Sequence, residues 1–367
     1  MTRVATMPWR QPAPGRATIG AVTANSTGDG VFLRACRREP VAFTPVWFMR
    51  QAGRALPEYR RVRAGVPMLE SCTRVDMVVE ITMQPVRRYG VDAAVLFSDI
   101  VLPLKAAGVE LDIVAGRGPV MAHPLSTPLD VARLPELEPD QVGYVAEAVR
   151  ALVGELGETP LIGFAGAPYT LASYLIEGGP SKEHARTRAL MRSHPQLWHD
   201  LLDRLARLSA TFLTVQLEAG AAAVQLFDSW AGSLAASDYA EFVLPHSATV
   251  LESVAGFGAP RIHFGVGTGE LLGLMARAGA DVVGVDWRVP LDEAARRVGP
   301  TVALQGNLDP AAALGSPESL ARQVERVLAC AEGLPGHVFN LGHGVLPETD
   351  PDQLTRVVEL VHERTRR

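Results

Sequence analysis

The chain has 367 residues, 47% of them hydrophobic, and a formal net charge of −5. This charge gives no general reason to expect nucleic acid or an anionic membrane as a partner, so any affinity for anions must be local. No stretch holds the roughly 18 uninterrupted apolar residues that a membrane span needs, and we expect a soluble, cytoplasmic protein. Three widely separated cysteines, Cys36, Cys72 and Cys330, argue against a disulfide framework and against a cysteine-ligated metal site.

The first residues, 1–30, are rich in Pro, Gly, Thr and Ala and show no sustained hydrophobic period. They also lack the continuous apolar segment of a signal peptide. We therefore expect a flexible N-terminal extension at 1–30. No linker-like segment interrupts the remainder, so residues 31–367 are expected to form one α/β domain.

Eight short apolar runs follow one another from residue 45 onward, separated by amphipathic stretches. Strands that are apolar on both faces and alternate with helices indicate a parallel sheet covered by helices. Eight such units predict a (β/α)₈ TIM barrel. A doubly wound open sheet is the alternative, but its GxGxxG fingerprint after an early strand is absent. The predicted strands are 45–49, 93–98, 161–166, 223–228, 261–265, 282–286, 302–306 and 337–342, and helical stretches include 181–192, 195–220, 269–279, 291–299 and 317–333.

Residues 108–140, after the second predicted strand, are too many and too rich in turn residues for a simple strand-to-helix loop. We predict a hairpin-bearing insertion at the barrel mouth.

The first predicted strand ends in Arg50 and Arg54, with Gly53 between them. Arginines four positions apart can face the same way on a helix, and their forked donors match carboxylates or phosphates. Gly53 would let a ligand approach the backbone closely. We interpret the pair as an anion clamp, and the alternative is two arginines in surface ion pairs.

Polar residues also follow most of the other predicted strands, where barrel active sites gather. Asp99 is the foremost candidate among them. It could simply cap a helix, but Pro103 disfavours helical backbone at Leu102, so Ile100–Pro103 is a poor helix start. A carboxylate with mostly apolar neighbours is suited to accept several N–H donors from a ligand. We expect no metal site, because these acidic residues are not interleaved with clustered His or Cys; the further strand-end residues are Ser98, Asp228, Ser229, Asp286, Gln305, Asn307, Gly342 and His343.

The chain resembles the uroporphyrinogen decarboxylase family in two signatures and several shorter segments. The resemblance spans roughly residues 30–360 and implies a (β/α)₈ barrel that forms a homodimer. It further implies cofactor-independent decarboxylation of the four acetate side chains of uroporphyrinogen III to methyls, giving coproporphyrinogen III in haem biosynthesis. The matching segments are PVWFMRQAGR (45–54), FSDI (97–100), GFAGAPYTLASYLIEGG (163–179), QLFDSWAG (225–232), LQGNLDP (304–310) and NLGHGV (340–345).

The resemblance also implies roles for individual residues. Asp99 would bond the pyrrole N–H groups at the centre of the macrocycle and, with Arg50, be catalytic. Without the resemblance, Tyr174 would be read as a core tyrosine, Ser229 as a cap and His343 as a backbone-bonded histidine. The implied substrate-binding residues are Arg50, Gln51, Ala52, Gly53, Arg54, Asp99, Tyr174, Ser229 and His343.

Loss of CO₂ needs an acceptor for two electrons. Lys105 and Lys182 are the only lysines, so an imine mechanism has few candidates. A pyrrole protonated beside the acetate-bearing carbon can accept the electrons itself, with Asp99 stabilising the cation. The proton donor stays open: Arg50 is a donor by position, though its very high pKa counts against it.

Two other functions are compatible with parts of the sequence. A zinc methyltransferase on the same barrel would show His-x-Cys near a strand end, where this chain has His263-Phe-Gly265. A tetrapyrrole carrier would share the arginine clamp, and CO₂ release distinguishes it from an enzyme.

Overall fold

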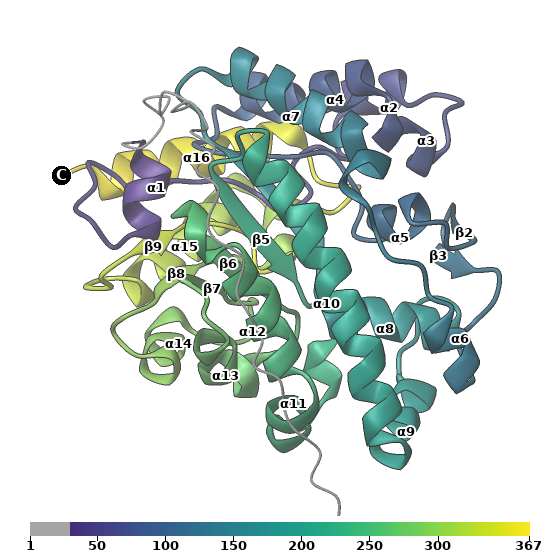
Figure 1. Cartoon of the computed structure of the whole chain (residues 1–367). Coiled ribbons are helices and arrows are strands. Elements are labelled where there is room, and N and C mark those ends of the chain that lie inside the picture. Colours follow the sequence, from purple (N-terminus) through teal and green to yellow (C-terminus); the bar gives the residue numbers. More distant parts are fainter. Residues whose placement is uncertain (1–29) are drawn as a thin grey trace, which may run out of the picture.

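The computed structural model describes residues 30–367 and has an α/β fold around one parallel sheet (Figure 1). Apart from Gly30, the extension predicted at 1–30 lies outside the described residues. Each strand of the sheet falls inside one of the predicted apolar runs from residue 93 onward, and almost all strand residues are buried. The seven strands lie side by side in the order β1 (Ala94–Val95), β4 (Leu161–Gly166), β5 (Ala223–Phe227), β6 (Arg261–Phe264), β7 (Val282–Gly284), β8 (Ala303–Gln305) and β9 (His337–Val338).

The sheet is curled. The side-chain amide of Gln305 on β8 donates to Gln225 Oε1 on β5 at 2.9 Å. These strands are three positions apart in the sheet, which would separate them by about 14 Å if it were flat. Trp47 Nε1 also donates to Gln305 Oε1 at 3.0 Å, so the first predicted strand reaches the same interior.

That first predicted strand, residues 45–49, is reduced to a single parallel bridge between Val46 and Phe339. The segment nevertheless lies beside the end of β9, because Phe339 N donates to Pro45 O at 2.8 Å. It also lies beside the residues that precede β1, because Asp92 N donates to Val46 O at 2.8 Å. Residues 45–46 thus bond to the segments that follow β9 and precede β1.

Side chains explain why the segment does not continue as a strand. Phe48 N donates to Gln51 Oε1 at 3.0 Å, and Met49 N donates to Asn340 Oδ1 at 3.1 Å. These backbone groups are satisfied without a ladder partner, so the pairing with the end of β9 goes no further than the bond from Trp47 N to Phe339 O at 3.3 Å. Period and composition do not reveal such long-range partners.

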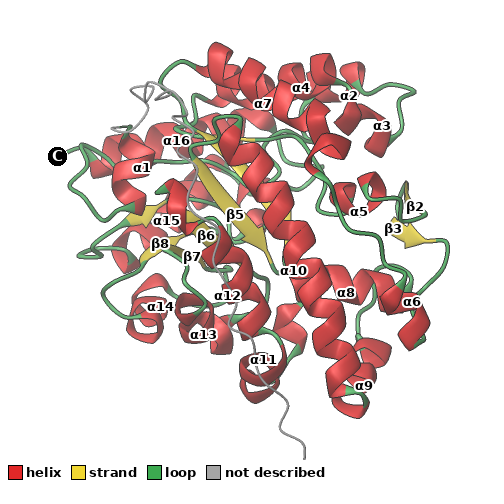
Figure 2. Ribbon diagram, viewed as in Figure 1, coloured by secondary structure: helices red, strands yellow, loops and turns green. Residues whose placement is uncertain are grey.

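Helices surround the sheet (Figure 2). The longest, α10 (Pro195–Glu218), packs an apolar face that includes Trp198, Leu205 and Phe212 against β4, α8 and α12. No helix within residues 30–367 is long and apolar enough to cross a membrane. The other α-helices are α1 (Val31–Cys36), α2 (Pro57–Val62), α3 (Met68–Thr73), α4 (Val75–Tyr89), α5 (Leu102–Ala106), α6 (Pro128–Ala132), α7 (Gly143–Leu156), α8 (Pro168–Glu177), α9 (Ala185–Ser193), α11 (Ala236–Phe242), α12 (Leu244–Ser253), α13 (Leu272–Arg277), α14 (Leu291–Val298), α15 (Pro317–Cys330) and α16 (Pro351–Thr365).

Strands β2 (Leu111–Val114) and β3 (Gly118–Met121) form an antiparallel pair outside the main sheet. Met121 N donates to Gly178 O at 3.1 Å, which attaches this pair to the C-terminal end of α8. The pair lies beside α5 in Figure 1. It therefore connects the segment after β1 with the helix after β4.

Candidate active site

The two clamp arginines lie in a loop. Residues 50–54 have no helical turn, and α2 begins only at Pro57, so the helical spacing argument for Arg50 and Arg54 does not apply. Arg50 has a left-handed backbone with φ of 59°, uncommon for a residue other than glycine. Arg60 Nη1 donates to Arg54 O at 2.6 Å and holds the far end of the loop.

Two glycines allow Arg50 to take this position. A Cβ on Gly53 would lie 2.8 Å from Arg50 O, and a Cβ on Gly344 would lie 2.7 Å from Arg50 Cγ. Gly53 is therefore required by the fold of the loop itself, which is a different reason from the ligand approach predicted for it. Gly344 packs directly on the arginine side chain.

Gln51 holds the loop from inside. Its side chain is 1% exposed, accepts from Phe48 N and donates to Ala93 O at 3.1 Å. Because both ends of the amide are occupied within the protein, the side chain positions the loop. Ala52, predicted with it as a ligand contact, is partly exposed.

Asp99 follows β1, and the residue is partly exposed to solvent. Its Oδ1 accepts from Val101 N at 3.0 Å, and Leu102 N donates to Asp99 O at 3.1 Å, after which α5 begins at Leu102. The prediction of a poor helix start is therefore wrong. Pro103 falls in the first turn of α5, where its missing N–H costs nothing.

The surroundings of Asp99 link it to the clamp. Burial raises the pKa of the Asp99 carboxyl above its usual range, while the Val101 N–H and the positive charge of Arg50 act in the opposite direction. An aspartate close enough to respond to Arg50 shares one site with it. Oδ1 accepts from the Val101 N–H, and no hydrogen bond to Oδ2 forms among the described residues.

Tyr174 lies on α8, is 8% exposed and contacts the Trp230 ring at 5.8 Å between centroids. Burial first, and the negative charge of Asp99 second, raise the pKa of Tyr174 to about 12. The phenol is therefore neutral at physiological pH and can donate its O–H. Its electrostatic coupling to Asp99 and to Arg50 places it at the same mouth.

Asp228 anchors the loop after β5 from beneath. It is fully buried and accepts from Thr170 Oγ1 at 2.9 Å, and Trp230 N donates to the same hydroxyl at 3.3 Å. Asp228 thus fixes the loop against α8 and is not itself a ligand-facing group. Ser229, between them, is partly exposed.

His343 follows β9 in a glycine-flanked turn. Its Nδ1 accepts from Gly344 N at 2.6 Å, so the neutral ring carries its proton on Nε2. Burial first, and the charge of Arg50 second, lower the pKa of His343 to about 4. The ring is therefore a neutral N–H donor at pH 7. It lies 6.5 Å from the Phe264 ring.

Aromatic rings line the carboxyl ends of three neighbouring strands. Phe164 and Phe227 meet edge to face at 5.3 Å, and Phe227 and Phe264 meet at 6.1 Å. Phe227 is partly exposed, and these rings give the mouth an apolar floor. Sequence reasoning did not include them, although phenylalanines at strand ends beside predicted site residues carried the signal.

The charge of Arg50 acts on the pKa values of Asp99, Tyr174 and His343, which gathers the four side chains at one end of the sheet. Arg54 is exposed in the same loop as Arg50. Among the described residues, it has no contact with Asp99, Tyr174 or His343. The charges within this cluster suit an anionic ligand with N–H donors near its centre.

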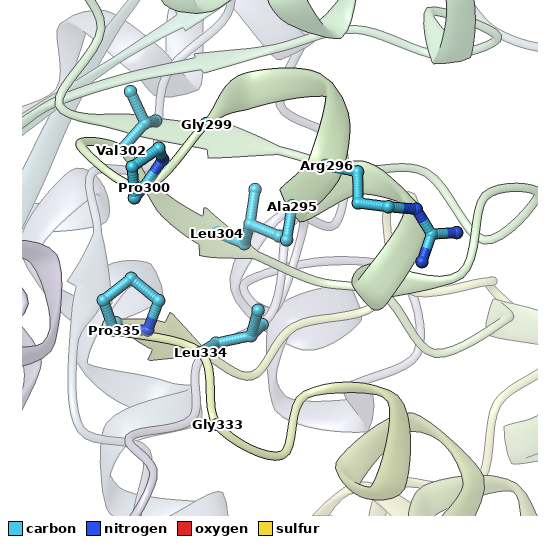
Figure 3. A pocket seen from close by; sticks show the side chains of 10 residues that line it. Ala295, Arg296, Gly299, Pro300, Val302, Leu304, Gly333, Leu334 and Pro335 are labelled. Atoms are coloured by element: carbon cyan, nitrogen blue, oxygen red, sulfur yellow. The ribbon is translucent and has the colours of Figure 1, made fainter.

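A different hollow lies at the opposite end of the strands (Figure 3). Its volume is about 390 Å³, and residues before β8 and β9, such as Val302 and Pro335, line it. Its lining is mostly apolar, with Arg296 at its edge. The candidate active site is at the carboxyl ends, because there the strand ends bring titratable side chains together.

Metal-ligating residues do not cluster anywhere in residues 30–367: no group of three or more His, Cys, Asp or Glu side chains could hold an ion. Both lysines are exposed, and Lys105 Nζ donates to Leu111 O at 3.1 Å. Neither lies in the desolvated surroundings that activate an amine.

Comparison with known proteins identifies the family. A family model described as uroporphyrinogen decarboxylase (URO-D) matches residues 27–364. Uroporphyrinogen decarboxylase of Streptomyces coelicolor is 68% identical over 342 residues, covering 93% of this chain and 96% of the relative. That of Salinispora tropica is 61% identical over 367 residues, covering 100% of this chain and 99% of the relative.

A solved structure of a methyltransferase from Methanosarcina mazei has a TM-score of 0.76 at 18% identity, covering 91% of this chain and 99% of that chain, and so shares the fold. The two decarboxylase relatives are far more similar to this chain in sequence than the methyltransferase is, and they match more than 90% of its length. The chain belongs to the uroporphyrinogen decarboxylase family.

Proposed function

We propose that this chain removes the carboxyl groups from the four acetate side chains of uroporphyrinogen III, giving coproporphyrinogen III in haem biosynthesis, without a cofactor. The observation that carries this proposal is the coupling of Asp99, Arg50 and Tyr174 at one strand-end mouth in a member of this family. On the family resemblance alone, we also propose that the chain forms a homodimer in the cytoplasm.

We also propose that residues 31–367 form a single (β/α)₈ barrel, in which the segment around Val46 takes the place of the eighth strand. The bridge to Phe339 and the hydrogen bond from Asp92 support closure. The antiparallel pair β2–β3 would then be an insertion at the rim of the mouth.

In the first chemical step, a proton is added to the pyrrole carbon beside the acetate-bearing carbon, which makes the ring an iminium-like cation. The bond between the methylene carbon and the carboxylate then breaks, CO₂ leaves, and the two electrons enter the ring. A second proton adds to the methylene carbon to form the methyl group, and the ring gives up the first proton. Atoms and electrons balance with no external acceptor.

The side chains supply the electrostatics of this sequence. In this proposal the Asp99 carboxylate accepts pyrrole N–H groups and stabilises the cation. Arg50 and Arg54 offer forks to the peripheral carboxylates, and neutral His343 and Tyr174 offer single donors. The proton donor is unassigned. Arg50 is close enough to Asp99 for its charge to lower the pKa of that carboxyl, but a guanidinium is a poor acid at neutral pH.

A zinc-dependent transfer reaction has less support. His263 is fully buried, its Nε2 lies 3.7 Å from Asp228 Oδ2, and Gly265 stands where a thiolate ligand would be needed. The pair therefore lies beneath the loop after β5. The methyltransferase from Methanosarcina mazei shares the fold of this chain, and we infer nothing about the reaction from it.

The test is direct. Purified protein is incubated anaerobically with freshly reduced uroporphyrinogen, and the product is weighed by mass spectrometry. Stepwise loss of up to four CO₂ is expected, before and after dialysis against EDTA. Tight binding with unchanged substrate mass would instead support a carrier, and activity that needs zinc to return would contradict the cofactor-free mechanism.

A further inference from the structure

A third arginine, Arg288, lies at the mouth, after β7. The turn at His343 identifies its location, because one of the glycines that flank this histidine packs against Trp287 and the other against Arg50 of the clamp. A Cβ on Gly342 would lie 2.8 Å from Trp287 Cα, and a Cβ on Gly344 would lie 2.7 Å from Arg50 Cγ. Trp287 and Arg50 therefore border one turn, and Arg288 follows Trp287 directly.

The guanidinium of Arg288 is held from two sides. Its Nη1 donates to Asp286 Oδ2 at 2.6 Å, and its Cζ lies 4.0 Å from the centre of the Trp287 ring. The Trp287 ring in turn stacks with the His343 ring at 6.5 Å and 21°. A cation over an indole face, with a carboxylate beside it, has little rotamer freedom left.

Asp286 is itself fixed. It is 2% exposed, and it accepts from the backbone N–H groups of Gly267 and Arg288. Asn307 Nδ2 donates to Asp286 O at 2.8 Å and so holds the same turn from β8. The residues that precede Arg288 thus form a rigid base for it.

The guanidinium still has free capacity. Its side chain is 51% exposed, and among the described residues only Asp286 accepts from its guanidinium. The N–H groups without an acceptor belong to the same planar guanidinium, whose fork matches the two oxygens of a carboxylate. Arg288 and Arg50 both act on the pKa of His343, in agreement with their positions around it.

We propose that Arg288 is a third carboxylate-binding arginine of this site, which holds a peripheral carboxylate of the tetrapyrrole beside His343. The inference rests on the proposed function, since it assumes a polycarboxylate substrate. Arg288 lies outside the segments that carry the family resemblance. Arg288 is remote from the reacting carbon in this role, so its contribution is to binding more than to the chemical step.

The experiment compares Arg288→Gln and Arg288→Lys with wild type at fixed ionic strength. Arg296→Gln is the matched control, because Arg296 is an exposed arginine on α14 and lines the hollow at the opposite end. We expect KM for uroporphyrinogen to rise roughly 5- to 50-fold in Arg288→Gln, with kcat within about two-fold, as for loss of one charged hydrogen-bonding fork. The lysine variant should fall between them, and Arg296→Gln should behave as wild type.

Inhibition by coproporphyrinogen, which keeps only the propionates, identifies the carboxylate. Weaker product inhibition in Arg288→Gln assigns a propionate, and unchanged inhibition assigns an acetate. An unchanged KM, or a lower melting temperature with unchanged KM, overturns the proposal and leaves Arg288 a structural partner of Asp286. If wild type does not release CO₂, the proposed function fails separately, and equilibrium dialysis of uroporphyrinogen against both proteins still decides the role of Arg288.

Discussion

The close packing of Gly344 on Arg50 allows the clamp to be tested without changing any polar group. In Gly344→Ala the new methyl carbon would lie 2.7 Å from Arg50 Cγ and 3.1 Å from Arg50 Cβ. Gly344 is not among the residues with positive φ, so alanine fits the backbone. The arginine side chain must therefore rotate away from its position.

The size of the effect follows from what Arg50 would lose. A hydrogen bond to a charged group contributes about 1.5–3 kcal/mol, which corresponds to about a 10- to 150-fold fall in kcat/KM. The assay is steady-state decarboxylation of uroporphyrinogen, with the melting temperature measured in parallel. Gly154→Ala is the control, because Gly154 lies in α7 with nothing within 4 Å of its added Cβ.

A double mutant identifies the route of the effect. If the methyl acts through Arg50, then adding Gly344→Ala to Arg50→Ala should cause almost no further loss, since the two residues are in contact. Additive losses, or a Gly344→Ala protein with kcat/KM within two-fold of wild type, would refute the reasoning.

Three further predictions concern the other site residues. Asp99→Asn should lower kcat by about 10²–10⁴. Because burial raises the pKa of Asp99 in the folded state, its ionised form destabilises the wild type at pH 7, and the variant should have a higher melting temperature there. This difference in melting temperature should vanish below about pH 4, where the carboxyl is protonated in both the folded and the unfolded state. Equal melting temperatures at pH 7, or more than half of wild-type turnover, would contradict these roles. Arg54→Lys should raise KM at matched ionic strength, because an ammonium lacks the fork, and an unchanged KM would remove Arg54 from the clamp. Because the pKa of His343 is about 4, we expect no inflection from it in kcat/KM between about pH 6 and 8. Its contribution to the free energy of unfolding should be lost as pH falls from about 6.5 through 4. An inflection near pH 6.5 that is absent from His343→Gln would contradict the neutral ring.

The sheet was predictable because buried parallel strands are continuous apolar runs, and Leu161–Gly166 matches its predicted bounds. Residues 45–49 were harder to predict, since their backbone is satisfied by side chains as distant in sequence as Asn340. The same limit applies to the site. Asp99 is indicated by its place after a strand, whereas the roles of Gln51 and Gly344 depend on tertiary contacts that no local pattern contains.

Arg288 shows a second kind of limit. It follows a predicted strand end at Asp286, and this position was the only sequence signal available. An arginine in a loop usually has only a surface role, so the stacking of Arg288 on Trp287, whose ring also stacks with His343, emerges only in three dimensions.

The central claim is that Asp99 collects pyrrole N–H donors and that the substrate ring serves as its own electron acceptor. A reduced macrocycle can tilt its four pyrroles toward one carboxylate, whereas the oxidised porphyrin is flat, carries two N–H groups and has no isolated pyrrole to protonate. The measurement is carboxylate loss from uroporphyrinogen and from uroporphyrin, side by side under strict anaerobic conditions. The account predicts steady loss from the reduced form and none from the oxidised form; steady loss from the oxidised form would contradict both the role of Asp99 and the protonated-pyrrole mechanism.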